Sequence, residues 1–298
     1  MRVFVTGATG FIGSQVVREL ISAGHHVVGL CRSEDKAPAL AAAGAEVHMG
    51  SLNDVDSLKA GAAKADAIIH LAFNHDFSTF SQNCEDDRRV IEALGSVLLG
   101  SDRPLLITSG TMIANTVPGE PAREDGPATS AAVHPRAASE ETANAVAAKG
   151  VNVGIVRLPQ VHDTARQGLV IVLVQTALEK GFFAYVGEGR NRWPAAHVLD
   201  VARLYRLAIE RAEPGAIYHA VAEEGIATRE IAETLSRRLK MPTKSITPEE
   251  APGHFGWFAM FSGFDAPASS DLTREWLDWQ PVERGLIADL QEYSGYGA

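Results

Sequence analysis

The chain has 298 residues, a formal net charge of −10 at pH 7, and apolar side chains at 46% of its positions. This length allows one large α/β unit or one large and one small domain, and the composition supports a sizeable core. Because the chain is acidic and has no basic block, we expect no nucleic-acid partner.

Cysteine usage and hydropathy narrow the class further. Cys31 and Cys84 are the only cysteines and have no metal-ligand spacing, so we expect neither a disulfide scaffold nor a metal site. The longest apolar runs are too short to span a bilayer, and no signal-peptide pattern precedes the first strand. We therefore expect a soluble, cytoplasmic protein that does not enter a membrane.

The first dozen residues predict a strand, a tight turn and the start of a helix. The β-rich run 2–6 leads directly into three glycines at three-residue spacing, and an amphipathic helical run follows. In such a turn the first glycine permits the sharp bend, the second lets the backbone approach a pyrophosphate, and the third lets the helix pack closely on the sheet. The helix N-terminus then faces the phosphates. The pattern predicts a dinucleotide site at Gly7, Thr9, Gly10, Phe11, Ile12 and Gly13.

The rest of the first half alternates strands and helices. We expect strands at 26–31, 45–49, 66–71, 104–108 and 151–157, and helices at 35–43, 55–64, 80–99 and 136–149. Alternation of this kind predicts an α/β fold with a doubly wound, parallel Rossmann sheet and helices on both faces.

Beyond Arg157 the pattern loosens. We expect helices at 169–180, 199–211, 228–240 and 271–277, with strands at 183–186 and 216–221, and Thr228 as an N-cap. We predict an NAD(P)-binding Rossmann domain over 1–165, to which 195–222 returns. A small mixed α/β substrate-binding lobe over 166–298 would lie above the carboxyl ends of the strands.

The end of the second predicted strand selects between the two nicotinamide dinucleotides. An acidic residue there would bind the ribose hydroxyl of NAD, but this strand ends at Arg32 and Ser33. A guanidinium and a hydroxyl suit a 2′-phosphate, so we predict NADP(H), with NAD(H) as the less favoured alternative. The competing interpretation is a surface Arg32 paired with Glu34 and Asp35.

Residues 6–13 (TGATGFIG) resemble the TGxxGxxG signature of extended short-chain dehydrogenases/reductases, the group that contains sugar-nucleotide epimerases and dehydratases. Further segments are similar to family motifs in the family's order: 66–73, 106–111, 156–161, 193–202 and 277–281. The resemblance covers nearly the whole chain and implies the same fold.

The resemblance also implies further cofactor contacts. Ser51 and Leu52 would flank the adenine, although the family usually has aspartate where Ser51 stands. The remaining residues implied to pass beneath the cofactor or border its nicotinamide are Leu71, Ala72, Phe73, Thr108, Leu158, Pro159 and Val161.

The chain departs from the family at the catalytic Tyr-x-x-x-Lys pair. Alignment on Glu140 places Arg136 at the lysine position and Ala132 at the tyrosine position, and no tyrosine occurs between Phe80 and Tyr185. Arg136 can hold a ribose hydroxyl or an anion. It is a poor acid, because a guanidinium has a pKa above about 12.

Candidate replacements for the missing acid follow the fifth strand or precede the helix. His134 lies near the tyrosine position, and histidine is the usual general acid near neutral pH; the competing interpretation is a loop histidine before Pro135. Ser109 and Thr111 follow the fifth strand at its carboxyl end, and one of them could orient the reacting oxygen.

We therefore predict an atypical extended short-chain enzyme, an NADP(H)-dependent oxidoreductase for a small carbonyl, alcohol or sugar-like substrate. One alternative is a catalytically silent NADP(H)-binding sensor or interaction protein, favoured by the missing tyrosine. Another is a nucleotide-sugar epimerase or dehydratase. We expect a monomer or a homodimer, the latter through helices 80–99 and 136–149.

Overall fold

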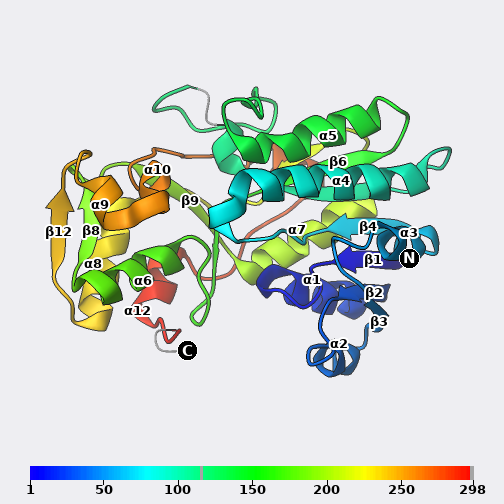
Figure 1. Ribbon diagram of the computed structural model, residues 1–298, viewed down its shortest axis with the longest axis horizontal. Coiled ribbons are helices and arrows are strands. Elements are labelled where there is room, and N and C mark those ends of the chain that lie inside the picture. Colours follow the sequence, from blue (N-terminus) through cyan, green and yellow to red (C-terminus); the bar gives the residue numbers. More distant parts are fainter. Residues whose placement is uncertain (115–116, 296–298) are drawn as a thin grey trace.

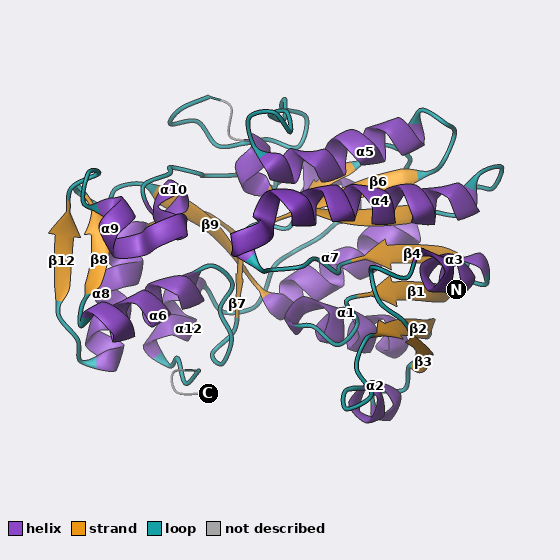
Figure 2. Ribbon diagram, viewed as in Figure 1, coloured by secondary structure: helices purple, strands orange, loops and turns teal. Residues whose placement is uncertain are grey.

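A seven-stranded parallel sheet forms the larger part of the computed structural model, which describes residues 1–114 and 117–295 (Figures 1 and 2). The strands pair in the order β10 (Ile217–His219), β6 (Val153–Leu158), β5 (Leu105–Gly110), β4 (Ala67–His70), β1 (Arg2–Thr6), β2 (His26–Cys31) and β3 (Glu46–Met49). This order confirms the predicted doubly wound parallel sheet.

Helices cover both faces of this sheet (Figure 1). On one face, α1 (Phe11–Ser22) packs against α7 (Val198–Arg211), which comes from much later in the chain. On the other face lie α3 (Val55–Ala63), α4 (Phe80–Leu98) and α5 (Ala138–Ala147), while α2 (Ala37–Ala42) packs beside β3. Three short 3-10 turns lie in the connections. Turn η1 (Phe77–Thr79) follows β4, η2 (Thr111–Ala114) follows β5, and η3 (Pro135–Ala137) precedes α5.

The side-chain alternation of β1 explains why two cores form. Val3 and Val5 point to the face covered by α1 and α7, whereas Phe4 points to the face covered by α3 and α4. All three side chains are fully buried, as expected for a central parallel strand with helices on both sides.

The smaller part of the molecule contains two further sheets (Figure 2). One pairs β11 (Glu223–Ala227), β9 (Arg192–His197) and β7 (Gln160–His162), and the other pairs β12 (Thr243–Ile246) with β8 (Phe183–Val186). Its helices are α6 (Val170–Lys180), α8 (Thr228–Leu239), α9 (Ala251–Phe255), the 3-10 turn η4 (Gly256–Phe258), α10 (Ala259–Ser262) and α12 (Leu286–Gln291). A separate apolar core lies between these elements. Helix α11 (Asp271–Leu277) instead packs against α7 and β10.

The predicted elements agree with the structure to within two residues at each end. Strands β7, β9, β11 and β12 and the short helices α9, α10 and α12 were not predicted, whereas α11 was. Strand β9 contains Pro194, which normally argues against a central strand. The structure accommodates it because Pro194 lies opposite a register shift in β11, between Glu223 and Ile226.

The predicted N-cap role of Thr228 is wrong. Thr228 is the first residue of α8, Ala227 is the N-cap, and the Thr228 hydroxyl donates to the Asn191 side-chain oxygen at 2.7 Å. That bond ties α8 to the start of β9 instead. Within the described ranges 1–114 and 117–295, every helix is too short or too polar to cross a bilayer.

Candidate functional site

The glycine turn after β1 has the shape that a pyrophosphate requires. Gly7 has a φ of +70°, and a Cβ there would lie 2.9 Å from the backbone nitrogen of Ala72. A Cβ on Gly13 would collide with the Gly7 carbonyl, and one on Gly10 would lie 3.1 Å from the same oxygen. Side chains would therefore fill this turn, whereas glycines leave the first-turn N–H groups of α1 open to an anion. The residues fit a dinucleotide.

Thr6 fixes the strand ends on either side of this turn. Its hydroxyl accepts the backbone N–H groups of Leu71 and Ala72, both at 3.2 Å, and lies 2.6 Å from Nδ1 of His70. The structure thus places the predicted residues Leu71 and Ala72 directly beside Gly7.

The end of β2 presents an unpaired guanidinium. Arg32 is exposed, and in the part of the chain that the structure describes it forms no ion pair with Glu34 or Asp35. Ser33 donates to Asp35 instead. The interpretation in which neighbouring carboxylates hold Arg32 therefore has no support from the geometry.

A cavity of about 220 Å³ lies past the carboxyl ends of β5 and β6, where the large sheet meets the smaller part. Of the predicted residues it brings together Phe73, Ser109, Thr111, His134, Arg136, Leu158 and Pro159. Most of its other lining residues are apolar or aromatic, and prediction missed them as site residues: Phe77, Phe80, Met112, Ile113, Leu169, Pro194, Phe261 and Ala266.

Three polar atoms in this cavity wall are buried and unsatisfied. Within the described residues, Ser109 Oγ, His134 Nε2 and Trp193 Nε1 have no hydrogen-bond partner. His134 is the N-cap of η3, and its Nδ1 accepts the backbone N–H of Arg136 at 3.3 Å. The neutral ring therefore carries its proton on Nε2. Burial, followed by the nearby Arg136 charge, lowers the pKa of His134, so the ring is mainly neutral at pH 7.

Arg136 is held by a buried polar network. Its guanidinium donates to Asp87 at 2.8 Å and to the Thr108 carbonyl at 2.7 Å, and lies 4.4 Å from the centre of the Phe73 ring. Asp87 also accepts from Nε2 of His70 at 2.9 Å. Since His70 contacts Thr6 through its other nitrogen, an unbroken chain of hydrogen bonds joins the glycine turn to the cavity.

Other predicted residues lie outside the cavity wall. The Thr108 hydroxyl is engaged by the His70 carbonyl at 2.8 Å and the Tyr205 hydroxyl at 2.7 Å. Val161 is buried in the core under α7. Ser51 and Leu52 are half-buried in the turn after β3.

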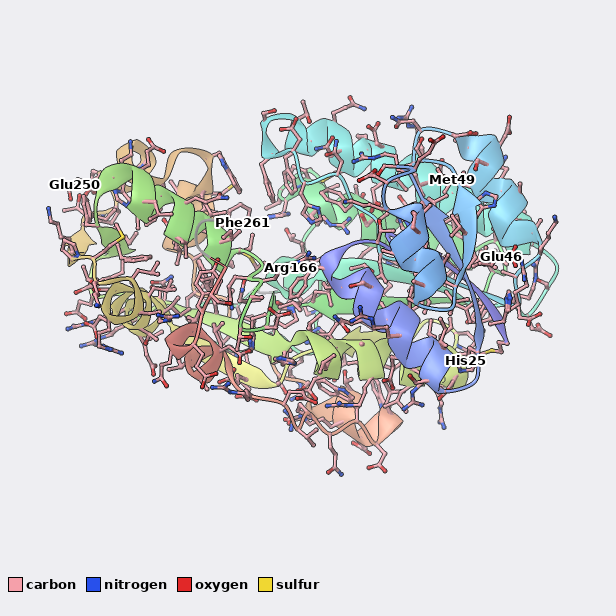
Figure 3. The ribbon with its side chains drawn as sticks, turned by 90° about the horizontal axis from the view of Figure 1, so that it is seen from below. His25, Glu46, Met49, Arg166, Glu250 and Phe261 are labelled. Carbon is pink, nitrogen blue, oxygen red and sulfur yellow. The ribbon has the colours of Figure 1, made fainter. Side chains whose placement is uncertain are left out.

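Arg166 is a basic residue near the glycine turn that sequence reasoning missed. It is exposed, and its guanidinium carbon lies 6.0 Å from the centre of the Phe11 ring. Figure 3 shows Arg166 beside the N-terminal end of α1, with Phe261 across the gap on the smaller part. No family motif marks this position, so only the folded structure reveals it.

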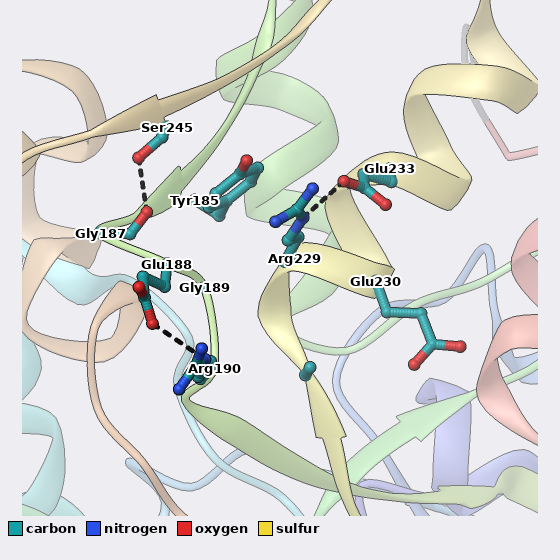
Figure 4. A pocket seen from close by; sticks show the side chains of 10 residues that line it. Tyr185, Gly187, Glu188, Gly189, Arg190, Arg229, Glu230, Glu233 and Ser245 are labelled. Carbon is teal, nitrogen blue, oxygen red and sulfur yellow. Dashed lines mark hydrogen bonds and ion pairs between the residues drawn. The ribbon is translucent and has the colours of Figure 1, made fainter.

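A second hollow, of about 580 Å³, lies on the smaller part between β8 and α8 (Figure 4). Four of its charged residues form two pairs: Arg229 contacts Glu233 at 2.7 Å, and Arg190 contacts Glu188 at 2.9 Å. Because this hollow is open and far from the glycine turn, we assign it no catalytic role. The described residues contain no group of three or more metal-ligating side chains.

Comparisons with known proteins agree with this geometry. The model of the NAD dependent epimerase/dehydratase family matches residues 3–222. The uncharacterized protein C2A9.02 of Schizosaccharomyces pombe is 47% identical over 97% of this chain and 98% of its own length. A 4-hydroxy-2-methyl-3-oxo-4-farnesyl-3,4-dihydroquinoline-1-oxide ketoreductase of Stigmatella aurantiaca is 26% identical over 90% of this chain and 84% of its own.

Among solved structures, a dTDP-glucose 4,6-dehydratase of Streptomyces venezuelae with NAD and TYD bound superposes with a TM-score of 0.78. The match covers 98% of this chain and 97% of that one at 21% identity, so it supports the fold alone. The family match spans most of the chain and includes both the glycine turn and the strands that carry the cavity. The chain therefore belongs to the NAD dependent epimerase/dehydratase family.

Proposed function

We propose that the protein is an NADP(H)-dependent oxidoreductase that interconverts a small carbonyl compound and its alcohol. The observation that carries this proposal is the pair of unsatisfied polar atoms Ser109 Oγ and His134 Nε2, which together with Trp193 Nε1 make three such atoms in the wall of a largely apolar cavity. Buried polar atoms are nearly always hydrogen-bonded, so unsatisfied ones at the carboxyl end of a sheet point to a ligand oxygen.

Four sets of residues would hold the cofactor. The glycine turn, with Thr9, Phe11 and Ile12, would bind the pyrophosphate, and exposed Arg166 would add a positive charge beside it. Arg32 and Ser33 would bind the 2′-phosphate, because the Arg32 guanidinium has no competing carboxylate partner within the described residues. Ser51 and Leu52 would flank the adenine. Leu71, Ala72, Phe73, Leu158 and Pro159 would line the nicotinamide side.

When bound, the reduced cofactor supplies a hydride to the carbonyl carbon, the carbonyl oxygen takes up one proton from solvent, and NADP⁺ is left. Ser109 and His134 would hold the oxygen with O–H and Nε2–H donors while negative charge develops on it. Thr111, whose hydroxyl reaches the Leu158 carbonyl only at 3.5 Å, is available to orient the same oxygen.

The missing family pair shapes this proposal. With alanine at position 132 and an arginine at position 136, the tyrosine acid would be absent and Arg136 would be a fixed positive charge near the substrate. Since His134 is mainly neutral at pH 7, it would act there as a hydrogen-bond donor rather than as a full acid. The ketoreductase from Stigmatella shows that carbonyl reduction occurs in a relative at 26% identity.

The proposal is tested with purified protein, NADPH and a broad carbonyl panel, following the absorbance of the reduced nicotinamide. Ser109→Ala should lower kcat/KM by about 100-fold without changing the Kd for NADPH, as expected for one lost oxyanion donor. His134→Asn keeps an N-cap acceptor but shortens the donor's reach, and should have a similar effect. Full activity in both variants would contradict the assignment.

A second candidate is a catalytically silent NADP(H)-binding sensor, favoured by the absence of tyrosine throughout 81–184. Tight NADPH binding with no turnover on any compound of the panel would support it.

We further propose the division into a cofactor domain (1–165, joined by 195–222) and a substrate lobe. The packing of α7 on α1 and the pairing of β10 with β6 support it. A monomer and a homodimer through α4 and α5 both remain compatible with the fold.

A further inference from the structure

The cavity that holds Ser109 and His134 has a composition and a size that restrict what can enter it. We propose that it selects an uncharged carbonyl compound with a compact aromatic or branched apolar substituent, and that it rejects anionic substrates, including nucleotide sugars. This inference rests on the proposed function, because it names the substrate class for the same site.

Size is the first argument. The cavity offers about 220 Å³, and the nicotinamide would take part of this volume, because Phe73, Leu158 and Pro159 line both. An engineered apolar protein cavity of about 150 Å³ accepts benzene. The remaining space therefore suits a substrate no larger than a single ring, whereas a nucleotide diphosphate joined to a sugar does not fit.

The wall supplies the second argument, because aromatic rings surround the cavity from both parts of the molecule. Phe73 follows β4 and Phe80 begins α4 on the large part, while Trp193 in β9 and Phe261 in α10 belong to the smaller part. Rings placed in this way bind flat apolar groups through area burial and edge-to-face contact. They offer few hydrogen bonds to a sugar.

Charge is the third argument. Among the lining residues that the structure describes, only Arg136 has a permanent charge, and Asp87 and the Thr108 carbonyl already accept hydrogen bonds from its guanidinium. Burial, followed by the Arg136 charge, lowers the pKa of His134, so its ring is mainly neutral at pH 7. A carboxylate or phosphate in the cavity would lose its water without gaining a free cation, which is unfavourable.

The wall at Phe77 is also braced from outside. Its ring stacks on Trp257 with centroids 4.1 Å apart and an interplanar angle of 10°. Phe77 belongs to η1 on the large part and Trp257 to η4 on the smaller part. The stack therefore joins the two parts next to the cavity that Phe77 lines, and it holds an apolar ring in this part of the wall.

The test compares benzaldehyde with 4-carboxybenzaldehyde, which has the same ring and aldehyde and one added carboxylate, and uses UDP-glucose as the nucleotide-sugar probe. Steady-state NADPH oxidation gives kcat/KM, and calorimetry in the presence of NADP⁺ gives the Kd of each compound whether or not it reacts. For the wild type we expect benzaldehyde to exceed its carboxylate by at least tenfold in both measures, and UDP-glucose not to bind.

A gain-of-charge variant makes the test independent of loss of folding. Leu169 lines the cavity next to α6 and is half-buried, so Leu169→Lys brings an ammonium to the wall while its stem reproduces the apolar contact. It should narrow or invert the preference for benzaldehyde. Leu178→Lys, on the exposed face of the same helix, is the matched control and should leave the preference unchanged.

The outcomes separate the two claims. Preferred binding or turnover of the carboxylate or of UDP-glucose by the wild type would overturn the substrate class and leave the NADPH chemistry standing. NADPH binding without turnover of any compound would contradict the proposed function. In that case the calorimetric preference between the two aldehydes would still support or overturn the apolar selectivity.

Discussion

Asp87 joins the glycine turn to the cavity, and its removal is the sharpest structural perturbation that the network offers. Its side chain is 2% exposed and accepts from Arg136 at 2.8 Å and His70 at 2.9 Å, with Ser139 as a third donor. Asp87→Asn keeps the shape but replaces one accepting oxygen with a donating NH₂ group. At least one buried donor then loses its acceptor.

The expected cost follows from the burial of the pair. Removing one partner of a buried ion pair costs about 3–5 kcal/mol, because the other charge is left uncompensated. The Arg136 side chain is 15% exposed, so some water reaches it, and we expect the lower end, about 3 kcal/mol at pH 7.

The pH dependence has a definite sign. Burial alone would raise the pKa of Asp87, but Arg136 and His70 more than offset it and hold the pKa well below its usual range. The stabilisation is therefore complete above the pKa of an unfolded aspartate, about 3.9, and is lost as the pH falls below that value. The difference between wild type and variant should shrink in the same window.

Urea unfolding at pH 7 and at pH values down to about 2.5 measures this difference. Asp86→Asn is the matched control, because Asp86 is 31% exposed and pairs with Arg89 on the surface of the same helix. Its cost should stay within about 0.5 kcal/mol. An Asp87→Asn protein as stable at pH 7 as the Asp86→Asn protein would refute the reasoning.

Two further predictions concern the turn and the core. Gly13→Ala places a Cβ against the Gly7 carbonyl and should weaken NADPH binding at least tenfold in a fluorescence titration. Gly253→Ala places its Cβ in open space and should leave NADPH binding unchanged. Equal Kd values for the two variants would count against the turn as the pyrophosphate site. Burial, followed by the Arg157 charge, lowers the pKa of His219 to about 3, so its contribution to stability is complete above about pH 6.5 and is lost as the pH falls toward 3. His219→Gln does not titrate and should reduce the acid sensitivity of unfolding between pH 6 and pH 4; an unchanged slope would disprove this role.

Most of the large sheet could be predicted because its strands and helices carry local signals. Most of its strands are short apolar runs, and helices α1, α2, α4 and α5 each end within three residues of a glycine. The smaller part carries weaker signals. Strand β9 has a proline in its centre, and β11 begins with two glutamates, so their pairing depends on a bulge that only the tertiary structure shows.

The sequence analysis named candidate site residues where the chain carries family motifs. It did not name residues whose place in the site depends on how the chain packs. Asp87 stands among several charged residues, and the sequence alone does not show which one is buried. One signal was available: Val90, Ile91 and Leu94 follow Asp87 at helical spacing on the buried face of α4. For His134, the sequence left two interpretations open, a site residue and a loop histidine. The unsatisfied Nε2 in the cavity wall favours the interpretation as a site residue.

The most direct test of the account is a titration of NADPH and NADH into the wild type and into Arg32→Glu. The account predicts that the wild type binds NADPH more tightly than NADH. It also predicts that the charge reversal weakens NADPH binding at least tenfold, roughly 1.4 kcal/mol, while the Kd for NADH stays within a few-fold. Equal weakening of both nucleotides, or no binding of either by the wild type, would contradict it.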